Sequence, residues 1–353
     1  MARTMKKVMF HLNSLGKGGA ERVVSLLANE FAKNNVEVVI ATEWFSEEEY
    51  EVAPQMKRIH AGLSGKDESA SRVAKQWIRI RNLRRVLLQE KPDVLISFCV
   101  KANYRAMMAA TGTGIPVIVS VRNDPKIDYV GKVNSLMNKL FLNRAAGCVF
   151  QTEEAKEFFD DILQNKSVII CNPVNEKYLS AERKTPEKKI VCVGRLVAQK
   201  NQMLLVNAFE KILEKYPDYD LYLYGDGSDD ECKEELLKYV AGNALGEKIH
   251  FMGLSSTLET DMADAAMVVL PSNYEGMPDA LMEAMALGLP VISTDCPCGG
   301  SRYWIDHKVN GQLFPVGDVK ALTDAILYYI ENNLLIFFMV LHHLFSLMLR
   351  FTL

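Results

Sequence analysis

The chain has 353 residues, of which 49% are hydrophobic and 24% are charged, a balance typical of a soluble globular protein large enough for two domains. The formal net charge of −3 excludes a generally basic protein that binds nucleic acid through its overall charge. The seven cysteines are scattered, several within apolar runs, which is typical of a reducing compartment and predicts a cytoplasmic protein. Cys296-Pro-Cys298 lacks the second pair that a zinc site needs and is interpreted as a structural turn.

The N-terminal half begins with an apolar run and a glycine-rich loop. Residues 7–12 predict a strand, and Gly18 and Gly19 precede apolar residues at helical spacing. Glycines between a first strand and a helix suit the close approach of a phosphate, although a plain tight turn explains them equally well. The loop lacks the G-x-G-x-x-G fingerprint of a dinucleotide site, and the apolar run 8–10 is too short for a signal peptide.

Alternating strands and helices follow along the rest of this half. This alternation predicts a parallel sheet covered by helices on both faces. The expected strands are 36–41, 92–98, 116–121, 147–151 and 167–171, and the expected helices lie near 70–90, 101–111, 130–145 and 152–163.

The predicted helix 70–90 alternates basic and apolar residues. Such a helix is typical of proteins that lie on an anionic membrane surface. The alternative is a surface helix whose apolar stripe faces the core, and we favour that interpretation for the stripe. The arginines lead to the hypothesis of a peripheral protein on the inner face of the membrane. The basic residues are Arg72, Lys75, Arg79, Arg81, Arg84 and Arg85.

Arg122 and Asn123 come directly after the expected strand 116–121. In parallel α/β sheets, ligands bind beyond the carboxyl ends of the strands. Arg122 is therefore a candidate contact for an anion or a hydroxyl group, and a structural salt bridge is the competing interpretation.

A second alternating set begins after the polar segment 176–188, which we interpret as a linker. Two parallel sheets in tandem predict two Rossmann-like domains facing a cleft. The expected strands are 189–193, 219–224, 248–252, 267–270 and 291–293.

Two cations flank the loop after the first of these strands. Arg195 and Lys200 lead into a helix expected to start near Asn201, and together they would make a clamp for a diphosphate. Both also fit the description of solvated surface charges. The strand-to-helix turn at Gly225 has the same potential use, with lower specificity.

The segment 267–293 predicts a strand, a loop, a helix and a further strand. Glu275 lies in the loop, where Gly276 allows a ligand to approach the backbone. Pro278 suits the first position of a helix, whose N–H groups and partial positive charge would face an anion. Glu283 lies within that helix. The two carboxylates could bind hydroxyl groups, so the segment fits a nucleotide-sugar. The alternative is that both glutamates belong to a solvated helix face without a ligand.

In this order the motifs resemble those of the large family of retaining glycosyltransferases of family 4, which have the two-Rossmann-domain (GT-B) fold. The resemblance covers residues 5–330 and is more specific in the C-terminal half. It implies an acceptor-side domain at 1–172 and a nucleotide-sugar-binding domain at 186–332. The motifs are Gly18-Gly19, Gly194-Arg195 with Lys200, Gly225-Asp226-Gly227, Phe251-Met252-Gly253, and Glu275 with Glu283.

The resemblance also implies roles for single residues. Arg195 and Lys200 would hold the donor diphosphate and stabilise it as the leaving group, where charge develops in the transition state. Glu275 would contact the donor sugar, and Glu283 the ribose hydroxyls. We do not assign Glu275 as a nucleophile. The remaining expected donor-binding residues are Gly18, Gly19, Gly225, Met252, Gly276, Met277 and Asp279. No Asp-x-Asp metal motif follows a strand, so neither a metal nor another cofactor is expected.

Two features depart from the family pattern. Where many relatives carry a histidine near the sugar, this chain has Arg122, which resembles a subgroup that builds bacterial capsule, O-antigen or lipid-linked oligosaccharides. The segment 334–353 is strongly apolar where relatives usually continue with polar amphipathic helices. Its length is close to that of a short membrane span. A membrane anchor and a reading-frame change or truncation remain open as interpretations.

The predicted function is the transfer of a hexose or N-acetylhexosamine from a nucleotide-sugar, such as a UDP-sugar, to a glycan or polyprenyl-linked acceptor. Arg122 and Asn123 are the candidates on the acceptor side. Two rivals remain: a nucleotide-sugar epimerase of the same fold, which would convert the donor without an acceptor, and a binding protein without turnover.

Overall fold

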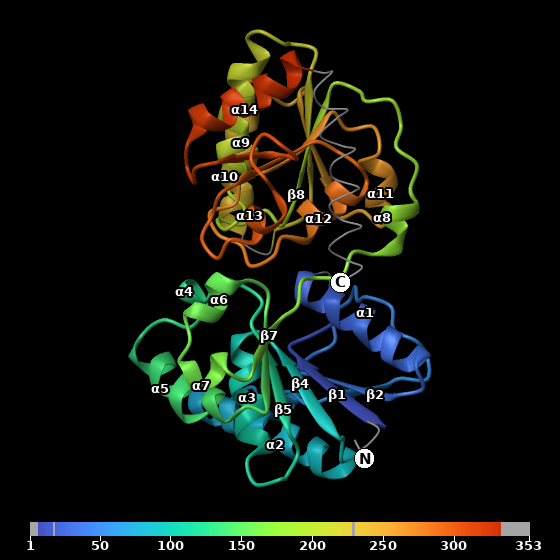
Figure 1. The fold of residues 1–353 in the computed structure, drawn as a ribbon, viewed down its shortest axis with the longest axis vertical. Helices are drawn as coiled ribbons and strands as arrows, with labels where there is room; N and C mark the ends of the chain where they lie inside the picture. The colour runs from blue at the N-terminus through green and yellow to red at the C-terminus, as the bar shows by residue number, and fades with distance from the viewer. Residues whose placement is uncertain (1–5, 17, 228–229, 333–353) are drawn as a thin grey trace. The chain divides into compact units, whose positions relative to one another are not determined.

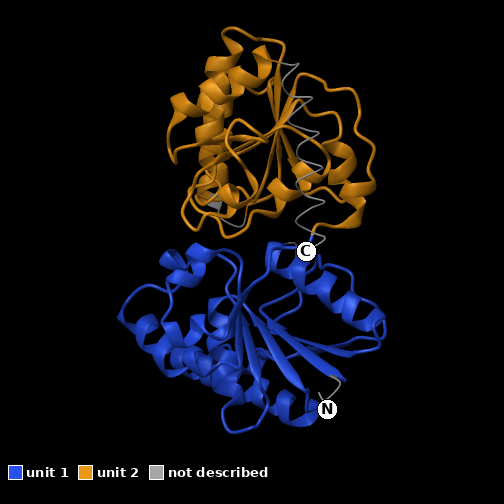
Figure 2. Cartoon of the chain, in the orientation of Figure 1, with its two compact units in different colours: residues 1–173 blue, residues 174–353 orange. Residues whose placement is uncertain are grey.

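The computed structural model describes residues 6–16, 18–227 and 230–332. The chain divides into two compact units, Met1–Pro173 and Val174–Leu353 (Figure 2). The apolar segment 334–353 lies outside the described residues. None of the helices in the described part of the chain is long and apolar enough to cross a membrane.

Unit 1 contains a parallel seven-stranded sheet with the order β3-β2-β1-β4-β5-β6-β7. Its strands are β1 (Lys7–Leu12), β2 (Glu37–Thr42), β3 (Lys57–His60), β4 (Val94–Phe98), β5 (Val117–Ser120), β6 (Gly147–Phe150) and β7 (Ser167–Ile169). Its helices are α1 (Gly19–Lys33), α2 (Arg72–Glu90), α3 (Val100–Ala110), α4 (Pro125–Asp128), α5 (Lys132–Leu140), α6 (Glu153–Glu157) and α7 (Asp161–Gln164), with short 3-10 turns at Gly65–Asp67 and Leu142–Arg144.

The central strand β1 is buried from its second residue to its last, as expected for a parallel strand that is covered on both faces. Its side chains Val8, Phe10 and Leu12 pack with Val23 and Val24 of α1 in one apolar cluster. This burial explains why α1 carries its apolar residues at helical spacing.

Unit 2 contains a parallel six-stranded sheet with the order β10-β9-β8-β11-β12-β13. Its strands are β8 (Lys189–Val193), β9 (Asp220–Tyr224), β10 (Ile249–Gly253), β11 (Met267–Leu270), β12 (Val291–Thr294) and β13 (Gln312–Phe314). Its helices are α8 (Glu176–Ser180), α9 (Gln202–Leu213), α10 (Asp230–Gly242), α11 (Leu258–Asp261), α12 (Asp279–Ala286), α13 (Gly300–Trp304) and α14 (Val319–Glu331).

Helices cover both faces of this second sheet. Figure 1 shows α9, α10 and α14 on one side of it and α8, α11 and α12 on the other. The fully buried Leu205 and Phe209 of α9 pack with Leu322 and Ile326 of α14 in the main apolar cluster of the unit. The predicted fold class, with two parallel-sheet α/β domains, is confirmed.

Several elements differ from the expectation. The strands β3 and β13 were not predicted, because both are short and β3 is only partly buried. The expected helix 130–145 begins only at Lys132, because its N-cap Gly131 has a φ of 94°, and it ends at Leu140, before the 3-10 turn Leu142–Arg144. The expected helix 152–163 is split at Asp160, whose ψ of 150° is extended. The polar segment 176–188 contains α8, which Asn175 caps by accepting from the N–H of Lys177.

Candidate functional site

Two loops of unit 2 lie side by side at the carboxyl edge of its sheet. The loop 194–201 follows β8 and the loop 271–278 follows β11, and these strands are paired neighbours. The backbone N–H of Asn273 donates to the carbonyl of Gln199 at 2.8 Å, and Nε2 of Gln199 donates to the carbonyl of Tyr274 at 3.0 Å. Segments far apart in the sequence therefore form one surface because parallel neighbours end at the same edge.

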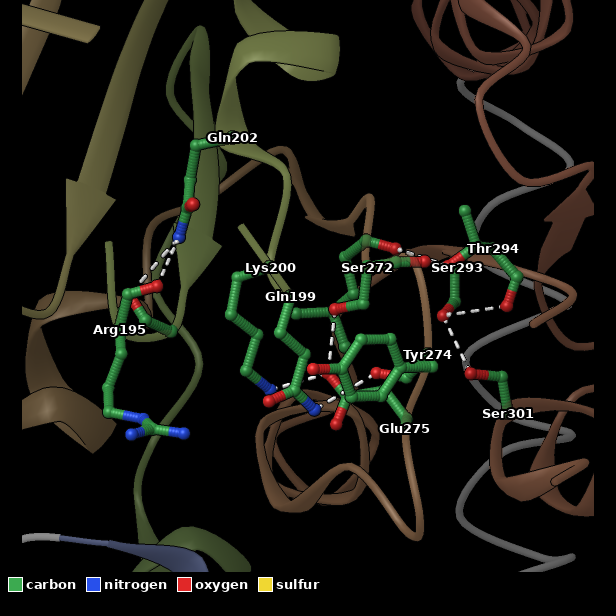
Figure 3. Close-up of polar contacts among 12 residues, drawn as sticks. Arg195, Gln199, Lys200, Gln202, Ser272, Tyr274, Glu275, Ser293, Thr294 and Ser301 are labelled. Atoms are coloured by element: carbon green, nitrogen blue, oxygen red, sulfur yellow. Dashed lines mark hydrogen bonds and ion pairs between the residues drawn. The ribbon is translucent and has the colours of Figure 1, made fainter. Parts of the chain in front are cut away.

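Glu275 occupies the centre of this surface. Its Oε1 accepts from Nζ of Lys200 at 2.5 Å and from Oγ of Ser272 at 2.6 Å (Figure 3). The hydroxyl of Thr294 donates in turn to the carbonyl of Ser272 at 2.6 Å. The Glu275 residue is only 7% exposed, and its Oε2 accepts no hydrogen bond from any residue that the structure describes. Two donors on one oxygen thus orient the carboxylate and leave the other oxygen for a ligand.

Arg195 lies on the same loop as Lys200 but is placed differently. Its carbonyl accepts from Nε2 of Gln202 at 2.9 Å, which fixes the backbone at the start of α9. Its side chain is exposed, and Figure 3 shows the guanidinium apart from the pair formed by Lys200 and Glu275. Within residues 6–16, 18–227 and 230–332 the guanidinium has no hydrogen bond or ion pair, so the structure joins only Lys200 to Glu275.

Gly225 supports the loop 194–201 from the neighbouring strand β9. Its φ is 128°, and a Cβ at this position would lie 2.2 Å from the carbonyl oxygen of Gly194. The carboxylate of Asp226 pairs with Lys233 at 2.6 Å. This close contact with the backbone of Gly194 explains why position 225 is a glycine. The predicted role of Gly225 in binding the donor stays a prediction.

The helix α12 carries the second predicted carboxylate. Glu283 is 3% exposed and Glu275 is also buried. The two carboxylates therefore do not belong to a solvated helix face, and that alternative interpretation is excluded. Pro278 is the N-cap of the helix, one residue before the first helical position predicted for it. Asp279, expected to contact the donor, is the first residue of α12 and is partly exposed.

The loop that contains Gly276 is held from behind by α13. A Cβ on Gly300 would lie 1.8 Å from the carbonyl oxygen of Gly276, so the two backbones are in direct contact. Nε1 of Trp304 donates to Sδ of Met277 at 2.6 Å. The side chain of Met277 is therefore buried against α13, and any contact of this residue with a donor falls to its backbone.

Met252, the remaining predicted donor residue of unit 2, lies near the end of β10. The pairing of β10 with β9 shifts register between Phe251 and Gly253, which is a β-bulge. The side chain of Met252 is 45% exposed, so the bulge turns it away from the core of the sheet.

The predicted residues of unit 1 also follow strand ends. Nη2 of Arg122 bonds to Oδ1 of Asn172, and its guanidinium lies 5.5 Å from the ring centroid of Phe98, a cation–π distance. Nδ2 of Asn123 donates to Oδ1 of Asp128 at 3.4 Å. Burial raises the pKa of the Asp128 carboxyl above its ordinary value.

The glycine loop of unit 1 leads directly into α1. Gly18 is the N-cap of this helix and Gly19 its first residue. The N–H of Gly18 donates to the carbonyl of Gly16 at 2.7 Å. This bond closes a tight turn, so the glycines have a structural explanation that needs no ligand. Their predicted contact with a phosphate stays a prediction.

A buried charged cluster in unit 1 was not predicted. Glu43 accepts from Nε of Arg79 at 2.7 Å and from Nη1 of Arg105 at 2.6 Å. His11 is completely buried, and its Nδ1 donates to the carbonyl of Ala41 at 3.0 Å. Burial, with Arg105 nearby, lowers the pKa of His11 to about 3. The signal was present, because His11 and Glu43 lie at the ends of two strands that pair in parallel.

Ser272 was likewise missed as a partner of Glu275, although it lies only three residues before it. The thiol of Cys296 belongs to the same neighbourhood, where burial and the charge of Glu275 raise its pKa to about 12. All seven cysteines are unbridged. Among the described residues, no group of three or more His, Cys, Asp or Glu side chains could hold a metal ion.

Comparison with known proteins places both units. Residues 187–332 match the family model described as glycosyl transferases group 1, and residues 17–178 match the model described as glycosyltransferase family 4. An uncharacterised glycosyltransferase of Methanocaldococcus jannaschii is 28% identical over 246 residues, which cover 63% of this chain and only 60% of that protein.

A relative from Campylobacter jejuni aligns over nearly the whole chain. It is named N-acetylgalactosamine-N,N'-diacetylbacillosaminyl-diphospho-undecaprenol 4-alpha-N-acetylgalactosaminyltransferase, and it is 24% identical over 346 residues, covering 93% of this chain and 91% of that protein. The structure of Anabaena HepE in complex with UDP and glucose superposes with a TM-score of 0.78 at 17% identity, covering 96% of this chain and 94% of HepE. Two family models that together extend over both units, with this shared fold, show that the chain belongs to the glycosyltransferases of family 4 (group 1) and is an enzyme of the GT-B class.

Proposed function

We propose that this enzyme transfers a hexose or N-acetylhexosamine, with retention of configuration, from a UDP-sugar to a glycan or lipid-linked oligosaccharide in surface-polysaccharide biosynthesis. The observation that carries the proposal is the oriented carboxylate of Glu275, whose Oε1 is held by Lys200 and Ser272. The relatives support the substrate classes, because HepE was solved with UDP and glucose and the Campylobacter jejuni transferase is named for an undecaprenyl diphosphate acceptor.

In this proposal, the two cations of the loop 194–201 serve the leaving group. Breaking the bond between the sugar and the phosphate places negative charge on the diphosphate and an oxocarbenium-like charge on the sugar. Lys200, already held by Glu275, and the exposed guanidinium of Arg195 would stabilise the diphosphate more in the transition state than in the ground state. We propose that these cations meet the need for positive charge, without a metal or other cofactor.

The carboxylates would bind hydroxyl groups of the donor. Glu275 would accept hydrogen bonds from the sugar through Oε2, and the backbone around Gly276 would lie close to the sugar because α13 supports that loop. Glu283 would hold the ribose. In each role a buried carboxylate accepts hydrogen bonds. Burying a carboxylate is unfavourable unless donors satisfy it, and the hydroxyl groups of the donor sugar would supply such hydrogen bonds.

Unit 1 would bind the acceptor through Arg122 and Asn123, at the carboxyl edge of its sheet. The protein would act at the inner face of the membrane, where polyprenyl-linked acceptors are anchored. The arginines of α2 support such a location only in part, because Arg79 pairs with Glu43 and Arg84 donates to the carbonyl of Ala109. Arg81 and Arg85 remain exposed.

The test is donor turnover by the purified chain. A panel of nucleotide-sugars is screened for thermal stabilisation, and the donor that binds is incubated with and without a membrane extract as acceptor source. The proposal expects release of the nucleoside diphosphate that depends on the acceptor. Conversion of the donor without acceptor would indicate an epimerase, and binding without release under either condition would indicate a binding protein.

A further inference from the structure

The helix α5 of unit 1 exposes its apolar residues to solvent and does not bury them against the protein. Val133, Leu136 and Leu140 recur at spacings of three and four, so they form one stripe on the helix. They are 75%, 57% and 43% exposed, and none of the residues of α5 is buried. A surface helix normally turns such a stripe toward the core, so the outward stripe calls for a physical explanation.

The polar side of α5 faces the protein instead. Oδ1 of Asn138 accepts from the hydroxyl of Tyr104 at 2.6 Å, and Tyr104 is itself buried. The hydroxyl of Tyr104 also lies 3.4 Å from the carbonyl oxygen of Asn134. A pocket on this side is lined by Ser135 and Asn138 of α5 together with other residues of unit 1. The inner side of α5 therefore contacts the protein through these hydrogen bonds and through Met137, which is partly buried.

Two further exposed apolar residues precede α5 in the chain, and exposed lysines occur in the same segment. Ile127 and Val130 are 49% and 50% exposed, and they precede α5 in the chain. Residues 129–152 contain no Asp or Glu. The lysines around the patch are Lys126, Lys132 and Lys139, all exposed. An apolar stripe bordered by cations complements the boundary between the acyl chains and the headgroups of an anionic bilayer.

We propose that α5 is the membrane-contacting element of this enzyme, lying in the plane of an anionic lipid surface with Val133, Leu136 and Leu140 directed into it. The proposal deepens the proposed function and rests on it for the choice of a lipid partner, because a polyprenyl-linked acceptor is held at such a surface. It assigns the contact to α5, whereas the sequence pointed to α2. In α2 the apolar residues Ile80 and Leu83 are buried, whereas Val73 and Trp77 near its start are 69% and 65% exposed.

A second copy of the chain fits the patch less well. A symmetric contact through α5 would bring Lys132 and Lys139 of both copies together, and like charges at an interface oppose association. One stripe of a nine-residue helix is also small beside the roughly 800 Å² per partner of a standard interface.

Local fluorescence quenching tests the contact directly. In the full chain, Leu136→Trp is mixed with vesicles of phosphatidylglycerol and brominated phosphatidylcholine, and the signal of the natural Trp44, Trp77 and Trp304 is measured in the wild type and subtracted. Leu179→Trp on α8, a position 56% exposed, is the matched control. We expect strong quenching for Leu136→Trp only. Equal quenching at both positions, or none at Leu136, would overturn the proposal, whatever other segment holds the protein to the vesicle.

A second experiment tests the charges. The double variant Lys132→Gln/Lys139→Gln is expected to bind anionic vesicles about fivefold more weakly for each lysine removed, since a lysine near such a surface contributes about 1 kcal/mol. Vesicles without anionic lipid should show little difference between variant and wild type. Unchanged binding, or sedimentation of the wild type as a dimer that Leu136→Asp dissociates, would contradict the proposal.

The same variants separate this proposal from the proposed function. Leu136→Asp should keep its thermal stabilisation by the nucleotide-sugar, because α5 belongs to unit 1 and the donor residues argued above lie mainly in unit 2. If the wild type binds lipid through α5 but turns over no donor, the proposed function fails and the membrane contact stands. If turnover is normal and quenching is absent, the proposed function stands and the membrane contact through α5 fails.

Discussion

The ammonium of Lys200 lies 2.5 Å from Oε1 of Glu275, and this ion pair joins the two loops on which the proposed reaction depends. The side chains are 19% and 9% exposed, so the pair is largely shielded from water. Lys200 therefore has two functions to distinguish: it balances a buried carboxylate, and it is proposed to receive the donor diphosphate.

Replacing each cation of the loop separates stability from donor binding. Lys200→Met leaves Glu275 buried with only Ser272 as a donor, so we expect it to lower the free energy of unfolding by about 2–4 kcal/mol. Arg195→Gln removes an exposed guanidinium that has no partner among the described residues, so stability should stay within about 0.5 kcal/mol. Both variants should lose donor affinity and turnover.

Urea unfolding and calorimetric titration with UDP measure these two effects. The informative variant is Arg195→Gln, because its folded structure should be unchanged. Wild-type UDP affinity together with wild-type turnover in this variant would remove Arg195 from the proposed site.

Ser272 is expected to act by positioning Glu275. Ser272→Ala removes the hydroxyl that donates to Oε1 at 2.6 Å, which should cost about 1 kcal/mol in stability and allow the carboxylate to turn. We expect a loss of at least about tenfold in kcat, since losing about 1.4 kcal/mol of transition-state stabilisation lowers the rate tenfold. Steady-state donor turnover is the measurement.

Ser301→Ala is the matched control for that variant. It removes the buried contact between the hydroxyls of Ser293 and Ser301 at 2.8 Å, which does not involve Glu275. A similar loss of stability with full activity is expected. Equal losses of kcat in both variants would indicate a general effect of packing and not the orientation of Glu275.

The backbone contact between α13 and the Glu275 loop predicts intolerance of any side chain at Gly300. A Cβ there would lie 1.8 Å from the carbonyl oxygen of Gly276, so Gly300→Ala must displace one backbone. Overpacking of this kind typically costs about 1–3 kcal/mol, and the shifted loop should reduce donor turnover strongly. Gly242→Ala is the control, because no atom lies within 4 Å of its Cβ; thermal unfolding should show it unchanged or slightly stabilised.

The buried His11 predicts a specific acid sensitivity of unit 1. Its pKa is about 3 in the folded chain, below the ordinary 6.5. The unfolded chain therefore binds a proton between these values that the folded chain does not, and stability falls as the pH is lowered from 6.5 toward 3. The slope from one such group is at most about 1.4 kcal/mol per pH unit. Glu43, whose pKa burial raises, acts in the opposite direction.

A comparison of wild type with His11→Asn isolates the contribution of the imidazole. We expect the variant to lose stability less steeply between pH 6.5 and pH 5, because it carries no group that titrates in place of His11. Urea unfolding followed by Trp44 and Trp77 in a Trp304→Phe background reports on unit 1 alone. Parallel curves for the two proteins would show that His11 is not the source of the acid sensitivity.

Local sequence patterns predicted the strands and helices where burial is continuous. β8 and β11 were placed at their observed bounds, because uninterrupted apolar runs between turn residues are typical of strands buried on both faces. The same patterns failed at β3 and β13, where short strands carry polar residues, and at α5, where an amphipathic sequence could not show which face would meet the protein.

The sequence by itself determined the alternation of strands and helices. It also predicted that Arg195, Lys200 and Glu275 follow strand ends, and that Glu283 lies within the next helix. These follow from periodicity and from glycine and proline positions, which act over a few neighbouring residues. Only the tertiary structure decided that Lys200 pairs with Glu275 while Arg195 does not. It also decided that Arg79 neutralises a buried carboxylate and that α5 turns its apolar stripe outward. Those outcomes depend on which loops the sheet order brings together, and contacts between residues so distant in the chain leave no local periodic signal.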